Sequence, residues 1–197
     1  MKLIAIFPAR HNSNRLPDKN FKDFFGIPML AWSLHESIQS ELFDKIIVST
    51  DKRIEWINEI QNKGGLTNVG VHTRRGKAMQ YDCTVDDICL DVLDKYKDYD
   101  YVCVIYPTAY AVTWKDLCKS FKEIREDSLK HSSNAIGVGN DIDNGGFYWQ
   151  KVDQFIKHND LMKFSERFEL PMVDINTIQD FAEAKLHALE LSCERFK

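Results

Sequence analysis

The sequence predicts a three-layer α/β fold, in which helices cover both faces of a mostly parallel sheet. Short apolar runs rich in branched residues alternate along the chain with longer segments of helical periodicity, which is typical of such sheets. The run at 101–106 is apolar on both faces, and this indicates a strand in the centre of the sheet. The 197 residues contain no internal repeat and no low-complexity linker, so we expect one domain over residues 1–197.

Several segments have the composition of β-strands, with branched or aromatic residues bounded by turn-forming ones. In chain order they are 3–6, 46–50, 69–72, 101–106, 135–138 and 146–149. Residues 140–144 form a polar turn between the last two of these strands. The segment 171–175 is expected to return as a further strand or as an edge segment.

Helical segments fill the intervals between these strands and present apolar residues at helical spacing. They are expected after Pro28, around 54–60, over 85–96, over 114–124 and after Thr177. Three of them begin with a Thr-x-x-Asp capping pattern, in which Asp stands in place of the Glu of a capping box: Thr84 to Asp87, Thr113 to Asp116 and Thr177 to Asp180.

The composition argues against several classes of function. A net charge of −4 is unlike that of a general nucleic-acid-binding protein, which would carry a basic face. No apolar run reaches transmembrane length and no signal-peptide pattern is present, so we expect no membrane partner and a cytoplasmic location. The five cysteines include no Cys-x-x-Cys pair, and we interpret Cys89, Cys103 and Cys118 as core residues in a reducing compartment. A catalytic cysteine and a zinc site are less favoured alternatives.

The loop at 8–20 is the main functional signal. It leaves the C-terminal end of the first strand, where open α/β sheets bind ligands. Arg10, Arg15 and Lys19 lie in it, and three cations with exposed backbone N–H groups can surround a triphosphate. Ser13 can donate a further hydrogen bond to phosphate, or it is simply a turn residue. No Gly-rich phosphate loop is present, and a solvated basic loop is the alternative.

This loop and two later segments resemble a known family. The acylneuraminate cytidylyltransferases, or CMP-nonulosonate synthetases, have an N-terminal signature that resembles Pro8-Ala9-Arg10, Ser13, Arg15-Leu16-Pro17 and Lys19-Asn20. Their pseudaminic acid branch has segments that resemble Tyr106-Pro107-Thr108-Ala109 and residues 143–149. The resemblance implies a Rossmann-like nucleotidyltransferase (glycosyltransferase-A-like) fold that uses CTP, a small acidic sugar and Mg²⁺.

The resemblance also implies roles for individual residues. Arg10 and Lys19 would contact the CTP phosphates, and with Asp174 they are the catalytic candidates. An arginine of the family recognises the base, and the spacing to Asp82 selects Arg75 over its neighbour, with a solvated cationic turn as the alternative. The other nucleotide-binding candidates are Ala9, Ser13, Arg15, Asn20, Thr84, Pro107 and Thr108, and the substrate-binding candidates are Tyr106, Ala109, Asn144 and Gly145. Helix capping already explains Thr84.

The chain departs from the family pattern in two places. Asp174-Ile175-Asn176 occurs where the family carries Asp-Ile-Asp, whose carboxylates hold Mg²⁺. We expect Asp174 and Asn176 to bind the metal more weakly, because a hard cation prefers charged ligands. After Val138 the chain passes almost directly to the next turn, where the family has a long hairpin that reaches a dimer partner and grips the sugar carboxylate. A homodimer is therefore only weakly supported.

The leading hypothesis is a cytidylyltransferase in which the anomeric hydroxyl of a nonulosonic acid attacks the α-phosphate of CTP and pyrophosphate leaves. The alternative is a catalytically impaired nucleotide-binding homologue with a regulatory or scaffolding role, suggested by Asn176 and by the shortened segment. A third hypothesis is a nucleotidyltransferase that acts on a different, smaller acceptor.

Overall fold

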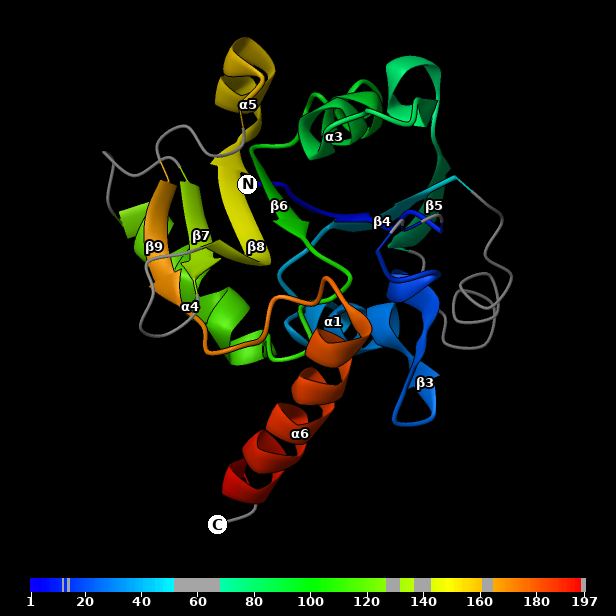
Figure 1. The fold of residues 1–197 in the computed structure, drawn as a ribbon. Helices are drawn as coiled ribbons and strands as arrows, with labels where there is room; N and C mark the ends of the chain where they lie inside the picture. The colour runs from blue at the N-terminus through cyan, green and yellow to red at the C-terminus, as the bar shows by residue number, and fades with distance from the viewer. Residues whose placement is uncertain are drawn as a thin grey trace.

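The structure is a computed structural model, and it describes residues 1–11, 13, 15–51, 68–126, 132–136, 143–160 and 165–195. A central sheet runs through these residues, with helices on both of its faces (Figure 1). Its strands are β1 (Leu3–Pro8), β4 (Lys45–Thr50), β5 (Val69–Thr73), β6 (Tyr101–Ile105), β7 (Ser132–Ile136), β8 (Asp143–Lys151) and β9 (Ser165–Glu169). A separate two-stranded ribbon consists of β2 (Asp23–Phe24) and β3 (Ile27–Pro28).

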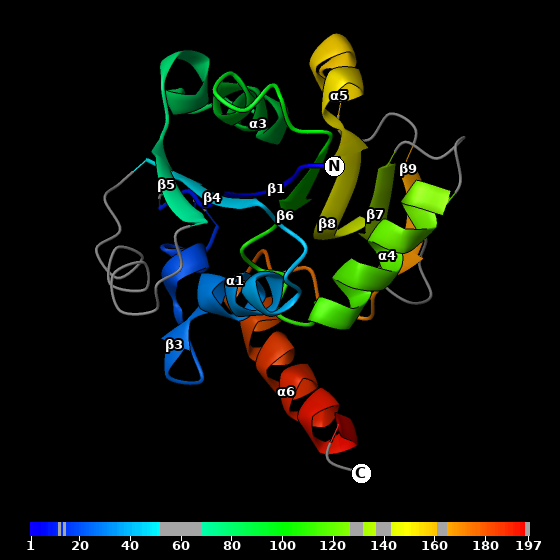
Figure 2. The same cartoon turned by 180° about the vertical axis from the view of Figure 1, so that it is seen from behind.

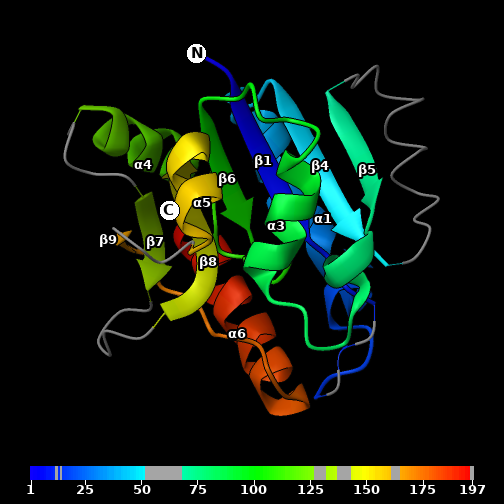
Figure 3. The same cartoon turned by 90° about the horizontal axis from the view of Figure 1, so that it is seen from above.

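The strand order in the central sheet is β5-β4-β1-β6-β8-β7-β9. The first four strands in this order are parallel to one another, whereas β8 is antiparallel to both of its neighbours. The C-terminal ends of β5, β4, β1 and β6 therefore share one edge of the sheet, and the segments that follow them meet there (Figure 3). Open α/β sheets bind their ligands at this edge.

Helices cover both faces of the sheet, as the sequence predicted. Those in the described ranges are α1 (Met29–Gln39), α3 (Val85–Leu93), α4 (Trp114–Glu126), α5 (Val152–His158) and α6 (Ile178–Arg195). α3 and α5 lie on one face, and α1 and α4 lie on the other (Figures 1 and 2). α6 packs its first turns beside α1 and then extends away from the sheet. None of these helices has the length and apolar character that would let it cross a membrane.

The first strand explains how the two layers of the core form. All six residues of β1 are buried. Because side chains alternate along a strand, Ala5 and Phe7 point into the core beneath α1 and α4, while Ile4 and Ile6 point into the core beneath α3 and α5. A continuous apolar run is thus what a strand covered on both faces requires.

The structure differs from the sequence-based prediction in several described segments. Asp143 and Asn144 begin β8, although the sequence predicted them in the polar turn at 140–144. Residues 171–176 are irregular rather than a strand, and the Val173 N–H donates to the Tyr110 hydroxyl at 3.1 Å instead of pairing with the sheet. β9 and α5 were not predicted, because the polar sequence of β9 lacks the alternation of a strand and α5 spans only seven residues. The helix expected around 54–60 lies outside the described residues.

Candidate active site

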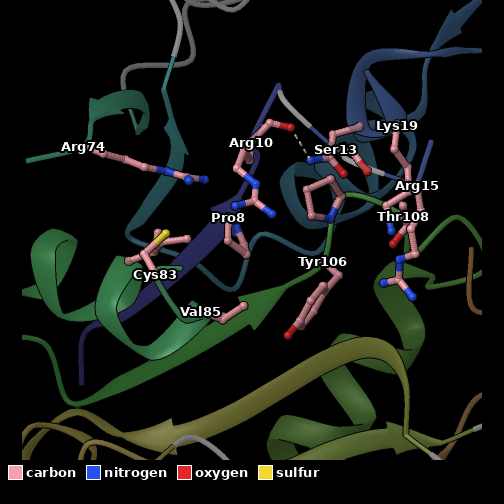
Figure 4. A pocket seen from close by; sticks show the side chains of 13 residues that line it. Pro8, Arg10, Ser13, Arg15, Lys19, Arg74, Cys83, Val85, Tyr106 and Thr108 are labelled. Atoms are coloured by element: carbon pink, nitrogen blue, oxygen red, sulfur yellow. Dashed lines mark hydrogen bonds between the residues drawn. The ribbon is translucent and has the colours of Figure 1, made fainter. Parts of the chain in front are cut away.

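A cavity of about 570 Å³ opens at the edge where the parallel strands end (Figure 4). Four segments line it: the loop after β1, the residues after β5, the start of α3 and the turn after β6. The lining residues are Pro8, Arg10, Ser13, Arg15, Lys19, Asn20, Arg74, Cys83, Val85, Ile88, Tyr106, Pro107 and Thr108. Among the residues that the structure describes, this lining carries four cationic side chains and no carboxylate, so the cavity is suited to a polyanion.

The loop after β1 is held in shape by contacts at both of its ends. The Asn20 side-chain amide donates to the Arg10 carbonyl oxygen at 2.8 Å. The His11 N–H donates to the Asp51 carboxylate at 2.9 Å, and the His11 ring stacks on Phe21 with ring centroids 3.9 Å apart. These contacts fix the backbone from which the cations project, and they explain the burial of Asn20.

The guanidinium of Arg10 and the ammonium of Lys19 reach the cavity from the two ends of this loop. Arg10 Nη1 donates to the Tyr81 carbonyl oxygen at 3.1 Å, which leaves its other donors for a ligand. Lys19 begins the short 3-10 helix η1 (Lys19–Phe21) and donates from Nζ to the Ile175 carbonyl oxygen at 2.5 Å. Burial lowers the pKa of Lys19, although the nearby Asp174 carboxylate opposes this shift. An anion brought to this ammonium would favour its charged form.

The residues after β5 place Arg74, not Arg75, in the cavity. Side chains alternate along a strand, and this alternation continues from buried His72 to buried Arg74, so that Arg75 points outward. Arg74 is only 2% exposed, and its Nη2 donates to the Ser49 carbonyl oxygen at 3.2 Å. Its Nε has no hydrogen-bond partner within the described part of the chain. Burial lowers the pKa of Arg74, and Asp51 opposes that shift.

Arg75 is bound elsewhere, which corrects the choice made from the sequence. Its Nε donates to the Asp91 carboxylate at 3.1 Å, and its Nη2 lies 3.0 Å from the same group. Asp82 is exposed and does not line the cavity. Thr84 caps α3 in a capping box, because its hydroxyl accepts from the Asp87 N–H while the Asp87 carboxylate accepts from the Thr84 N–H. The Thr84 hydroxyl is therefore engaged in the helix cap.

The turn after β6 forms the opposite wall of the cavity. Tyr106, Pro107 and Thr108 line it, whereas Ala109 is fully buried in the core and contributes no side-chain surface. Ala9 is likewise fully buried, and its N–H donates to the Ser49 carbonyl oxygen at 2.8 Å. These two alanines therefore support the site by packing.

β8 approaches this wall through a glycine. Gly145 has φ +66°, and a Cβ atom placed on it would lie 3.9 Å from the Tyr106 ring. Asn144 precedes it in β8, and its side chain lies outside the described residues.

The candidate metal ligands lie beside Lys19, outside the lining of the cavity. Asp174 is exposed, and its carboxylate accepts a hydrogen bond from the Asn176 side-chain amide at 2.6 Å. Asp180 is engaged differently, because its carboxylate caps α6 by accepting from the N–H groups of Asn176 and Thr177 at 2.8 and 2.7 Å. These hydrogen bonds lower the pKa of Asp180. Within the described ranges, no three His, Cys, Asp or Glu residues group as metal ligands.

Comparison with known proteins decides the family. Residues 4–166 match the family model described as cytidylyltransferase. The chain belongs to the cytidylyltransferase family. It is therefore an enzyme of the cytidylyltransferase type, and no finding favours the alternative of a catalytically impaired homologue.

Relatives of this cytidylyltransferase include enzymes named for nonulosonic acids. It is 26% identical to the pseudaminic acid cytidylyltransferase of Campylobacter jejuni over 94% of this chain and 96% of that protein. It is 38% identical to the N-acylneuraminate cytidylyltransferase of Streptococcus agalactiae serotype III over 50% of this chain and 23% of that protein. The resemblance stated from the sequence is confirmed.

Solved structures confirm the nucleotidyltransferase type of fold. A CMP:2-keto-3-deoxy-manno-octonic acid synthetase complexed with CTP superposes with a TM-score of 0.69 at 14% identity, over 96% of this chain and 100% of that one. A cytidylyltransferase from Leptospira borgpetersenii gives 0.68 at 16% identity, over 99% and 95% of the two chains. At such identities the agreement concerns the fold alone.

The Campylobacter alignment also bears on the length of the cytidylyltransferase. It spans 227 positions, but 94% of this chain is only about 185 residues, so about 42 positions are occupied in the relative alone. The shortened segment expected after Val138 stays a prediction. Residues 137–142 themselves lie outside the described part of the chain.

The cavity of the cytidylyltransferase contains residues that sequence reasoning missed. Arg74, Cys83, Val85 and Ile88 were not chosen as site residues, although all four line it. Arg74 could have been found from the alternation of inward and outward side chains that begins in β5, because this alternation directs Arg74 inward. The signal for Val85 and Ile88 was their place in the first turn of a helix that starts at the ligand-binding edge of the sheet.

Proposed function

We propose that this cytidylyltransferase transfers the cytidylyl group of CTP to the anomeric hydroxyl of a nonulosonic acid, pseudaminic acid or a close relative, and releases pyrophosphate. The observation that carries the proposal is a cavity whose described lining includes Arg10, Arg15, Lys19 and Arg74 and no carboxylate. The names of its relatives support the sugar class. Attack by the sugar hydroxyl oxygen on the α-phosphorus forms one P–O bond as the bond to the β-phosphate bridging oxygen breaks.

The loop after β1 holds the triphosphate in this proposal. Arg10 and Lys19 reach the cavity from the two ends of this loop, and Arg15 adds a third cation. Their charges offset those of the triphosphate and of the pyrophosphate as it leaves, and the fixed backbone keeps the α-phosphate in line with the acceptor. Ser13 and Thr108 supply neutral donors at the same surface.

Arg74 reads the base. A guanidinium presents parallel N–H donors, and it can donate to both O2 and N3 of cytosine because both atoms are acceptors. Uracil carries a proton on N3, so the same pair of donors would meet a donor there. Arg74 lines the cavity, so its guanidinium can meet a base that is bound there. We therefore expect CTP to bind more tightly than UTP.

Mg²⁺ fits the residues beside Lys19 only when a phosphate completes its ligand set. Asp174 offers a carboxylate and Asn176 offers an amide oxygen after a flip of its side chain, and Mg²⁺ is commonly held by one or two carboxylates together with substrate phosphates. The ion would neutralise phosphate charge. In the free protein the Asn176 amide N–H donates to the Asp174 carboxylate, and metal binding through the amide oxygen would replace this hydrogen bond. An Asn176→Asp variant should bind Mn²⁺ in the absence of nucleotide more tightly than the native chain, as measured by electron paramagnetic resonance.

The acceptor sugar is placed at the wall formed by Tyr106 and Gly145. Tyr106 lines the cavity in the turn after β6, and Gly145 of β8 lies beside the Tyr106 ring. We further propose that the enzyme works in the cytoplasm, without nucleic-acid or membrane partners. Its oligomeric state is best tested by ultracentrifugation, with a homodimer as one outcome.

Isothermal titration with CTP and Mg²⁺ tests the proposal. Binding at micromolar to millimolar CTP is expected, followed by pyrophosphate release when pseudaminic acid is added, with N-acetylneuraminic acid and 2-keto-3-deoxy-manno-octonic acid as competing acceptors. A protein that shows no heat of binding at millimolar CTP would end the nucleotide assignment. Binding without pyrophosphate release from any of the three acceptors would end the assignment to nonulosonic acids.

A further inference from the structure

A free thiol lines the proposed nucleotide cavity. Cys83 immediately precedes Thr84, the N-cap of α3, and it is partly exposed. Its sulfur lies on the same wall of the cavity as Arg74 and Val85 (Figure 4). It forms no disulfide with any cysteine in the described ranges. Nothing in the proposed transfer reaction uses this group.

The other described thiols are poorly placed to react. Cys89 and Cys103 are fully buried, and burial raises the pKa of both. Cys118 donates to the Ser40 carbonyl oxygen at 3.8 Å, and burial raises its pKa as well. The thiolate is the nucleophile in thiol–disulfide exchange, so these three shifts suppress reaction. Among the four cysteines whose side chains the structure describes, Cys83 is thus the one with access to a reagent that enters the cavity.

The cavity around Cys83 selects for negative charge. Arg74 is almost completely buried, its Nε is unpartnered among the described residues, and its guanidinium is directed into the cavity (Figure 4). Arg74 and Cys83 both line this cavity. Arg10, Arg15 and Lys19 line the same cavity, so its charge favours an anion. An anionic reagent is therefore concentrated beside the thiol.

We propose that Cys83 is a modification site at which an anionic low-molecular-weight disulfide attaches by thiol–disulfide exchange. The Cys83 thiolate attacks one sulfur of the reagent, the reagent's S–S bond breaks as the bond to Cys83 Sγ forms, and the other half leaves as a thiolate. Arg74 holds the negative charge of the attached group.

The attached group and a nucleotide exclude one another. The cavity measures about 570 Å³, which is the size of a pocket for one small ligand. Both occupants would need Arg74, the buried guanidinium that faces the thiol. This second part of the inference rests on the proposed function, whereas the modification itself does not.

The test uses glutathione disulfide as the anionic probe and bis(2-hydroxyethyl) disulfide as the uncharged one. Mass-spectrometric peptide mapping of the full chain should show that glutathione disulfide modifies Cys83 at least about tenfold faster than Cys118. Molar salt should slow that reaction several-fold and leave the reaction with the uncharged disulfide unchanged, since salt screens charge. Saturating CTP should protect Cys83, and dithiothreitol should restore CTP binding to the modified protein.

Two variants make the test specific. Cys83→Ser should lose the mapped adduct, and its CTP affinity should not respond to glutathione disulfide. Cys118→Ser should behave as the native chain does. Equal modification of Cys83 and Cys118, or a reaction of Cys83 that ignores salt, would overturn the modification site. Modified protein that binds CTP with undiminished affinity would overturn the exclusion. Failure of the unmodified protein to bind CTP would refute the proposed function instead, and the peptide maps would still decide the modification.

Discussion

Replacing Lys19 by Met separates a ligand-binding cation from a structural one. The substitution keeps most of the apolar stem and removes the ammonium that donates to the Ile175 carbonyl oxygen at 2.5 Å. Two effects on folding oppose each other. The lost hydrogen bond costs about 1–3 kcal/mol. The substitution also removes a charge whose burial disfavours the folded state, as the lowered pKa of Lys19 shows. This second effect stabilises the folded protein.

The effect on nucleotide affinity has no such compensation. A hydrogen bond to a charged group contributes about 1.5–3 kcal/mol, which corresponds to a loss of roughly 10- to 150-fold in CTP affinity. The free energy of unfolding should change by less than about 1 kcal/mol, because the two folding effects partly cancel. The variant should therefore fold normally and bind poorly.

Urea denaturation and isothermal titration measure the two quantities on the same preparation. Lys22→Met is the matched control, because Lys22 follows the same short helix but does not line the cavity, and it should bind CTP with native affinity. A Lys19→Met protein that lost several kcal/mol of stability and bound CTP normally would refute the reasoning. Lys19 would then be a structural lysine.

Three further results are expected. Arg74→Lys keeps the positive charge but loses the paired N–H donors of the guanidinium, so CTP affinity should fall about tenfold and the ratio of CTP to UTP affinity should decrease. Arg75→Lys should change neither the CTP affinity nor this ratio in the same titrations. Only charged Lys19 binds phosphate, and burial lowers its pKa, so CTP affinity should fall as the pH rises through that pKa; titrations from pH ~7 to ~10 should show this in the native chain and not in Lys19→Met. Thr84→Ala should lower the free energy of unfolding by about 1 kcal/mol in urea, through loss of the cap on α3, and leave CTP affinity unchanged.

The fold could be predicted from the sequence wherever the apolar composition of a segment indicates that the segment is buried. β1 and β6 are apolar on both faces because helices cover both faces of the sheet. Once β1 is recognised as a buried strand, the cationic loop that follows it is placed at the ligand-binding edge. β9 was not predicted because its polar residues do not favour a strand on their own. It forms a strand by pairing with β7, and this pairing cannot be read from the residues of β9. The segment 171–176 is irregular because its backbone bonds to the side chain of Tyr110 rather than to a neighbouring strand.

The candidate site was predicted less completely than the fold. The loop after β1 could be placed because its position depends only on the strand before it. The choice between Arg74 and Arg75 depends on which of two adjacent side chains faces inward, and spacing to a distant aspartate carries no information on that. The hydrogen bond from Asn176 to Asp174 depends on side-chain rotamers, which the sequence does not determine.

The central position of β1 has a consequence for synthesis of the chain. The residue opposite Ile4 in β4 lies 41 positions later, and the residue opposite Leu3 in β6 lies 98 positions later. This apolar strand is therefore synthesised before both of its neighbours and waits for the second of them until β6 is made. Contacts of such long range fold slowly, and unpaired apolar strands aggregate while they wait. Until Ile105 has emerged, the nascent polypeptide should depend on chaperones to keep its first ten residues from associating with other chains.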